Sequence, residues 1–397
     1  MALYSEVRVC NSLRPTKTKC NYVYVFGLDT NCIKSGTDYV RLLSPNNDLS
    51  TRIDFLVDYK IPPTFKCRDD GEVPLCIVGH KVLESLLRLN RPLEALSIFD
   101  IARFAVLFRF RPRIRVIQLT AKMQRPDPVV DTTALGVIIP HKGSGRRLKN
   151  CLSSISDPHK SNTYVGFDER KQHYHRTVAA EHKSTKFFEC APSGRGPYSL
   201  RNALTERAKC QFIAFQDSDD IPCFDRFFTL EAELKNYPNQ VIGSHILSLD
   251  LINRKFRILR FPLSPGSFGN FIPSYSMHFP ATAMSKSKFL AVGALCGSRT
   301  HSLDSQFLWR AAFNAQMRNL DDFLYIQVKR QRSLTTSSRT GFGSTERSNL
   351  SNAWKRDTIR IQRGELKIQN SSLWPVERAD PKLVEISTRS DGFVAKA

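Results

Sequence analysis

The sequence predicts an α/β fold, with a largely parallel, Rossmann-like sheet flanked by helices. In the middle of the chain, short apolar segments alternate with segments whose apolar residues recur at helical spacing. We expect strands over 134–140, 163–167 and 211–215, with helices over 146–155 and 199–208 between them. Strands that alternate with helices in this way form parallel sheets covered by helices.

Each predicted element has a local reason. The segment 134–140 is apolar almost throughout, as expected of a strand buried on both faces. In the helix that follows, Leu148, Cys151 and Leu152 share one face, because helical residues three or four apart lie above one another. Ser199 has the short polar side chain that favours the start of the next helix.

Length and composition indicate two or three folded domains. The chain has 397 residues, of which 41% are hydrophobic and 24% charged, as is usual in globular proteins. A segment rich in proline, aspartate and threonine at 123–133 is the best candidate for a linker. We therefore divide the chain into a separate N-terminal domain over 1–132, an α/β domain over 133–345 and a basic C-terminal extension over 346–397.

The N-terminal domain is predicted to mix strands and helices, and the sequence assigns it no role. Apolar runs at 22–27, 53–57 and 74–79 indicate strands. Helical spacing over 80–90 and 92–108 indicates a helical pair.

The stretch after about residue 326 is polar and rich in serine, threonine and arginine. Such a composition is typical of exposed loops. We expect a mobile flap there, and little order in the tail beyond about residue 370.

The net charge of +22, from 59 lysines and arginines against 37 acids, predicts an anionic partner. A field of this sign attracts nucleic acid, anionic lipid headgroups and phosphorylated small molecules alike. The run 103–115 interleaves arginines with aromatic and aliphatic residues. It fits a membrane surface or nucleic acid, or a core helix followed by a strand with arginine stems on the solvent side.

The sequence is expected to belong to a cytoplasmic protein. It has no apolar run of the roughly 18 residues that span a bilayer, and its first residues lack the apolar core of a secretory signal. Its ten cysteines include no CxxC pair, which favours reduced thiols over a zinc site. Peripheral contact with the inner face of a membrane stays compatible with these features.

The most informative segment is 211–220, where an apolar strand runs directly into Asp217, Ser218, Asp219 and Asp220. In open α/β sheets, ligands bind beyond the carboxyl ends of the strands. Carboxylates two residues apart can converge on one divalent cation, which in turn binds phosphate oxygens. The alternative is an acidic run that opens the next helix.

The order of motifs over residues 135–310 resembles glycosyltransferase family 2, whose members are inverting enzymes of GT-A fold. The first strand ends in Ile139-Pro140 and a helix of the L..CL.SI type follows. Arg201-Asn202 then precedes the DSDD run of Asp217 by fifteen residues, and Asp304 leads into a further helix. This spacing is more specific than the acidic run alone.

The resemblance implies a role for each matching position. Pro140 and His141 would lie at the nucleotide, Asp168 would contact the uracil ring, and Arg201 and Asn202 would shape the donor pocket. Asp217 and Asp219 would bind the ribose and a Mn²⁺ or Mg²⁺ ion, Asp304 would be the general base, and Arg330 or Arg332 would clamp the diphosphate. A cation would neutralise the departing diphosphate, and a positioned carboxylate would activate the acceptor hydroxyl.

The chain also departs from the family pattern. Leu303 stands where a glutamate commonly precedes the base, and Ala294 stands where a second glycine is usual. No histidine follows Asp304, since His301 is the last in the chain.

The resemblance thus predicts an inverting glycosyltransferase of polysaccharide biosynthesis that takes a UDP-sugar by default. The acceptor would be a glycan or lipid-linked hydroxyl, and nucleic acid is not an expected partner. Two alternatives stay open. One is a nucleic-acid-binding protein, which the charge suggests. The other is a sugar nucleotidyltransferase, which the glycine- and arginine-containing loop 141–147 suggests.

Overall fold

The computed structural model describes most of the chain after residue 133 and a set of strands before it. In the first 117 residues, the strands are described by their backbone. The described residues are 8–10, 23–27, 52–58, 68–72, 75–79, 103, 111–117, 134–170, 172–265, 276–297, 301–331, 333, 340–341, 343–375 and 381–386.

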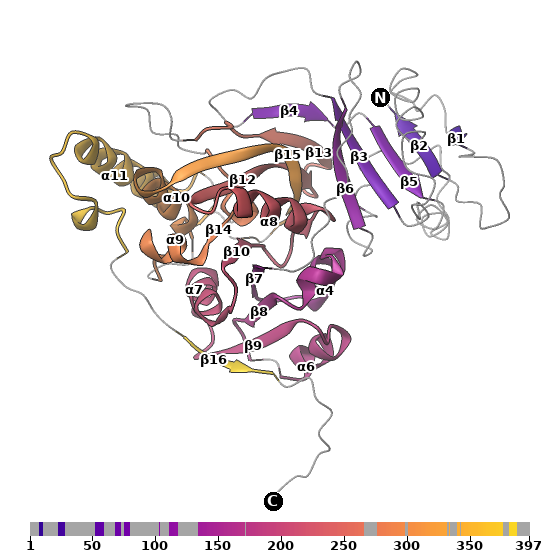
Figure 1. Cartoon of the computed structure of the whole chain (residues 1–397), viewed down its shortest axis with the longest axis horizontal. Coiled ribbons are helices and arrows are strands. Elements are labelled where there is room, and N and C mark those ends of the chain that lie inside the picture. The colour runs from indigo at the N-terminus through magenta and orange to yellow at the C-terminus, as the bar shows by residue number, and fades with distance from the viewer. Residues whose placement is uncertain are drawn as a thin grey trace, which may run out of the picture.

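A parallel sheet of four strands forms the centre of the molecule (Figure 1). Its strands are β7 (Leu135–His141), β8 (Thr163–Phe167), β9 (Lys186–Ala191) and β10 (Phe212–Phe215). They lie in the order β9-β8-β7-β10 and run parallel. The chain therefore builds outward from β7 in one direction and then returns to its other side, so that β7 and β10 meet at a reversal of strand order. The predicted fold class and all three predicted strands are confirmed.

The sheet continues past β10 with strands of both directions. Strand β14 (Ala283–Ser285) is antiparallel to β10 and to β12 (Gln240–Asp250). The long β15 (Gln316–Lys329) runs parallel to β12, and β13 (Lys255–Arg260) runs antiparallel to it. The edges are formed by β11 (Ile221–Pro222) on β15 and by β16 (Lys382–Glu385) on β9.

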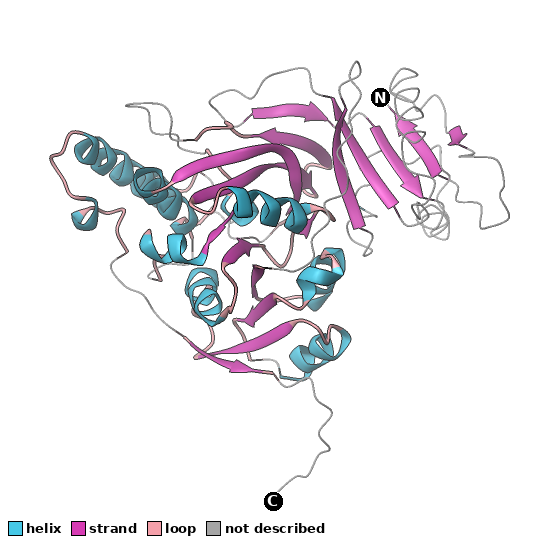
Figure 2. Ribbon diagram, in the orientation of Figure 1, coloured by secondary structure: helices cyan, strands magenta, loops and turns pink. Residues whose placement is uncertain are grey.

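Helices cover both faces of this sheet (Figure 2). Successive residues of β7 face opposite ways: Ile138 packs with α7, α9 and α10, whereas Val137 and Ile139 pack with α4, α6 and α8. Both predicted helices are confirmed, although the second begins after Gly196, and Ser199, expected at its start, lies inside it. The helices are α4 (Gly145–Ser154), α5 (Asp157–Lys160), α6 (Gln172–Glu181), α7 (Pro197–Arg207), α8 (Arg226–Asn236), α9 (Lys286–Ala291), α10 (Leu303–Asn314) and α11 (Thr345–Gln362), with 3-10 turns η2 (Phe279–Ala281) and η3 (Ile368–Asn370).

The first 117 residues contribute strands to two sheets. Five of them form a separate sheet in the order β1-β2-β5-β3-β6, whereas β4 pairs with β13 of the central sheet. The predicted strands are confirmed. The helical pair, apart from Arg103, and the linker lie outside the described residues. The strands are β1 (Arg8–Cys10), β2 (Val23–Gly27), β3 (Arg52–Asp58), β4 (Arg68–Glu72), β5 (Leu75–Gly79) and β6 (Arg111–Ile117).

The C-terminal part is more ordered than the sequence suggested. Helix α11 occupies much of the expected flap, and Trp354 on it packs with Trp309 and Leu373. The Arg310 guanidinium donates to the Leu373 carbonyl at 2.6 Å, and β16 extends the central sheet. The prediction of little order beyond residue 370 is therefore wrong for these segments, because apolar residues such as Leu373 are buried against α10. None of the helices described here combines the length and apolar character of a membrane span.

Candidate functional site

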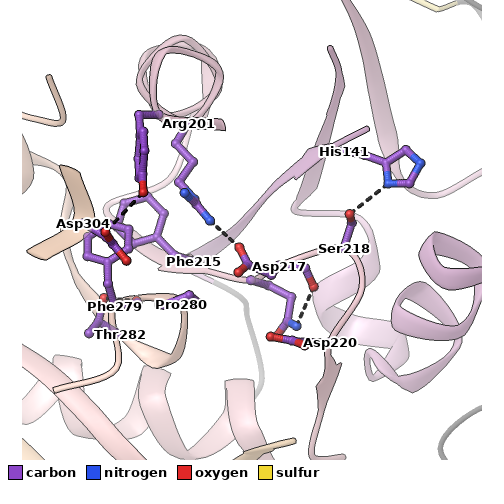
Figure 3. A network of polar contacts seen from close by, with 12 residues as sticks. His141, Arg201, Phe215, Asp217, Ser218, Asp220, Phe279, Pro280, Thr282 and Asp304 are labelled. Carbon is purple, nitrogen blue, oxygen red and sulfur yellow. Dashed lines mark hydrogen bonds and ion pairs between the residues drawn. The ribbon is translucent and has the colours of Figure 1, made fainter. Parts of the chain in front are cut away.

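The candidate site lies at the carboxyl ends of β7 and β10, where the strand order reverses. Such a reversal opens a crevice in which open α/β sheets bind their ligands. His141 ends β7, and its Nδ1 lies 2.8 Å from the Ser218 hydroxyl in the turn after β10 (Figure 3). Burial lowers the pKa of His141 to about 4, so its ring is neutral at pH 7. This bond fastens the two strand ends together.

Asp217 is the first acid of the turn, and it forms an ion pair with Arg201 (Figure 3). Arg201 is buried on α7, so that its charge is directed to this carboxylate. The pKa of Asp217 is raised, chiefly by burial. Arg201 opposes that rise, and the charges of Asp219 and Asp304 add to it. Two further negative charges therefore act on Asp217 from across the site.

Asp219 forms an ion pair with a different arginine from the one that pairs with Asp217. Arg330 follows β15, and its Nε and Nη2 lie 3.0 and 2.5 Å from Asp219 Oδ2. Asp220 fixes that strand end, since it accepts from the Tyr325 hydroxyl and the Val328 amide, each at 2.7 Å. Burial raises the pKa of Asp220 well above its usual range. The far end of a 14-residue strand is thus held against the acidic turn.

Asp304 lies on the other side of Asp217. It occupies the first turn of α10, after Ser302 in a left-handed conformation with φ of 65°. Its Oδ1 accepts from the Tyr198 hydroxyl at 3.1 Å, and Arg201 lies over the Tyr198 ring at 5.7 Å. A continuous path of contacts therefore joins Asp304 to Asp217, although 87 residues separate them in the sequence.

Asp168 and Asn202 serve the scaffold in this structure. Both Asp168 carboxylate oxygens accept from the backbone, from the amides of Arg195 and Gly196 at 2.8 and 3.0 Å. The Asn202 side chain makes two bonds to the backbone of Leu295, at 2.7 and 3.0 Å. These buried groups hold the loops around the crevice through two backbone hydrogen bonds each.

Of the two remaining predicted residues, the structure describes Pro140 but not Arg332. Pro140 is buried within β7, next to Gly166 of β8, and reaches the site only through its neighbour His141. Arg332 lies outside the described residues. The structure therefore brings together His141, Arg201, Asp217, Asp219, Asp304 and Arg330.

The donor chemistry of Asp217 and Asp219 fits a hard divalent cation of limited protein coordination. Their oxygens are the ligands that Mg²⁺ and Mn²⁺ take, and about a third of each side chain is exposed. Among the described residues, no third acid, histidine or cysteine joins them in a metal-binding group. A cation held here would keep water or phosphate oxygens as its other ligands, as Mg²⁺ commonly does.

Three residues of the site were not predicted as site residues. Tyr198 holds Asp304, Tyr325 holds Asp220, and Arg147 lies in the first turn of α4 near Asp219 and Arg330. Tyr198 lies three residues before Arg201 on one helix, and that spacing was the available signal. Tyr325 and Arg147 reach the site only through the three-dimensional fold.

Comparisons with known proteins give a likeness of fold only. No family model matches the chain, and no curated protein sequence matches it. Crystal structures of S. aureus TarS do resemble it. The complex of TarS 1-349 with UDP-GlcNAc has 16% identity and a TM-score of 0.43, over 62% of this chain and 68% of that one. A longer TarS chain has 17% identity and a TM-score of 0.42, over 62% of this chain and 40% of that one. Values this low carry no argument about activity, which must rest on the site.

Proposed function

We propose that this protein transfers a sugar from a nucleoside diphosphate sugar, by default a UDP-sugar, to an acceptor hydroxyl with inversion. The observation that carries the proposal is the path Asp304–Tyr198–Arg201–Asp217 at the carboxyl edge of the sheet. It offers a half-buried carboxylate on one side of the crevice and an arginine-paired acidic turn on the other. An inverting transfer needs a base and a leaving-group site on opposite sides of the sugar.

In this proposal Asp304 takes the proton of the acceptor hydroxyl. The hydroxyl oxygen then bonds to the anomeric carbon while the bond from that carbon to the diphosphate breaks, and the nucleoside diphosphate leaves with the electron pair. The Tyr198 hydroxyl orients the Asp304 carboxylate. A positioned base of this kind contributes roughly 10²–10⁴-fold to the rate.

Asp219, with Asp217, is the proposed holder of Mn²⁺ or Mg²⁺. A cation there would neutralise charge on the leaving diphosphate. Arg330 would supply a second positive group for the same charge, since arginine pairs well with phosphate oxygens. We propose a glycan or lipid-linked sugar as the acceptor and a cytoplasmic location, with the excess of basic residues favouring contact with an anionic membrane surface.

A nucleotide-release assay tests the proposal. The full chain is incubated with a panel of nucleotide sugars, with Mn²⁺ or with EDTA, and compared with Asp304→Asn. We expect release of nucleoside diphosphate from one donor and its loss in the variant. Absence of release from every donor in the panel, with no thermal stabilisation by UDP, would overturn the proposal.

The same assay separates the nearest alternative. A sugar nucleotidyltransferase on a similar sheet would place a glycine-containing loop after its first strand, and here Gly143 takes a φ of 105° in that loop. Such an enzyme releases pyrophosphate, so the phosphorus product decides between the two reactions. Binding of nucleic acid that is steeply salt-dependent and insensitive to Asp219→Ala would instead favour a nucleic-acid-binding protein.

A further inference from the structure

We propose that Arg147, together with Arg330, binds the diphosphate of the nucleotide. This inference rests on the proposed function, because it identifies the protein groups that meet the phosphates which that function brings. It adds a binding residue that the family 2 motifs do not contain, although Arg147 ends the loop 141–147 that suggested a nucleotidyltransferase.

Arg147 lies at the edge of the sheet where the crevice opens. The loop after β7 leads into α4, and the Arg147 amide donates to the Ser144 carbonyl at 3.2 Å in the first turn. A Cβ atom added at Gly143 would lie 3.6 Å from Arg147 Nη2, so the guanidinium lies against this loop. The bond between His141 and Ser218 ties the same loop to the acidic turn.

The charges around Arg147 are unbalanced. It is half-buried, and within the described part of the chain its guanidinium forms no hydrogen bond or ion pair. Its pKa is lowered by burial and by the charge of Arg330, while Asp219 acts in the opposite direction. Arg330 pairs with Asp219, whereas Arg147 feels both charges without contacting either group. A partly desolvated cation without a partner is unfavourable, which favours an added anion at this point.

A diphosphate matches this arrangement better than a single carboxylate would. Its two phosphate groups can engage two arginines at once, and each guanidinium fork suits a pair of phosphate oxygens. The neighbouring start of α4 adds backbone N–H groups with a favourable dipole for anions. Arg330 is bound to Asp219 through side chains alone, so it can exchange that carboxylate for a phosphate.

Calorimetry on the full chain tests the role of Arg147. The probes are UDP and uridine, and the variants are Arg147→Gln and the matched control Arg146→Gln, which removes the same charge from an exposed neighbour. We expect Arg147→Gln to weaken UDP binding about 10- to 100-fold, as for a lost hydrogen-bonded charge pair. Uridine affinity should be unchanged in both variants, and Arg146→Gln should bind UDP as wild type does.

The outcomes are separable. If Arg147→Gln binds UDP as tightly as wild type, the role of Arg147 is refuted while the proposed function stands. If wild type binds neither UDP nor any other nucleoside diphosphate, the proposed function fails and this inference fails with it. Arg147→Lys keeps the charge and loses the fork, so we expect it to fall between wild type and Arg147→Gln. That variant also guards against loss of fold.

Discussion

Two acids follow buried parallel strands in this molecule, and their carboxylates are used in opposite ways. Asp168, after β8, is held by two backbone amides of the 195–196 loop. Asp219, after β10, is held by the Arg330 side chain. Backbone amides of a packed loop cannot leave without disturbing the loop, whereas an arginine side chain can rotate away. The carboxylate of Asp219 after β10 can therefore change its partner, whereas the carboxylate of Asp168 after β8 is fixed to its loop.

The largest effect is expected at Asp304, the proposed general base beside the acidic turn after β10. Asp304→Asn should lower transfer by about 10²–10⁴-fold, because the amide cannot take the acceptor proton. The free energy of unfolding should hardly change, since an amide oxygen still accepts from Tyr198. Turnover of the donor and a denaturant titration measure the two quantities. Equal activity of the variant would remove Asp304 from the chemistry.

The next effect concerns His141, whose hydrogen bond to Ser218 joins the ends of β7 and β10. Burial lowers the pKa of His141 to about 4, below the 6.5 of an unfolded histidine. The unfolded chain therefore binds a proton more readily, so the stabilisation is complete above pH 6.5 and is lost as the pH falls towards 4. Between pH 7 and pH 4, wild type should lose about 3 kcal/mol more stability than His141→Asn.

Urea titrations at the two pH values measure this difference, because other titrating groups are common to both proteins. A variant that loses as much stability as wild type would show that His141 is not held neutral by the fold.

A smaller effect is expected on the rigid side. Asp168→Ala should cost about 2 kcal/mol of stability, because two amides lose a charged acceptor. Asp157→Ala is the control. Its exposed pair with Lys160 should contribute under about 1 kcal/mol. Thermal unfolding compares the variants, and similar melting temperatures for both would break the distinction drawn between the two acids.

The smallest effect concerns the ability of Asp219 to exchange Arg330 for a cation. Arg330→Gln should leave Asp219 free, so that Mn²⁺ binds without nucleotide about tenfold more tightly, in line with the Coulomb energy of a partly exposed pair. Lys329→Gln removes the same charge one residue earlier and should bind Mn²⁺ nearly as wild type does. Electron paramagnetic resonance of free Mn²⁺ gives both affinities. Equal affinities in the two variants would mean that Arg330 does not compete with a cation.

The sequence predicted the α/β centre well because its signals are local. Apolar runs such as 163–167 coincide with β8. The DSDD run lies at a strand end, as expected, and Arg201 meets Asp217 because fifteen residues of helix and strand return the chain to one edge. Tyr325 was missed because contacts between distant segments leave no periodic trace, and Arg147 was noted only within the loop 141–147 that suggested a nucleotidyltransferase.

The sequence mispredicted the C-terminal part of the chain, where a few buried apolar side chains determine which segments are ordered. The stretch after 340 is polar on average, and average polarity predicts a loop. In the structure, Trp354 and Leu373 pack with Trp309, and those few apolar residues fix α11 and the segment behind it. The resemblance assigns Asp168 to the uracil ring, and that role stays a prediction; in this structure its carboxylate accepts from the backbone of a loop.

The central claim is that a nucleoside diphosphate binds at the crevice between β7 and β10 and draws Arg330 away from Asp219. A crystal structure of the full chain with UDP and Mn²⁺ tests it most directly. The account predicts the diphosphate within hydrogen-bonding distance of Arg330, with the contact between Arg330 and Asp219 broken. UDP bound away from the acidic turn, or Arg330 still paired with Asp219 beside bound UDP, would contradict it.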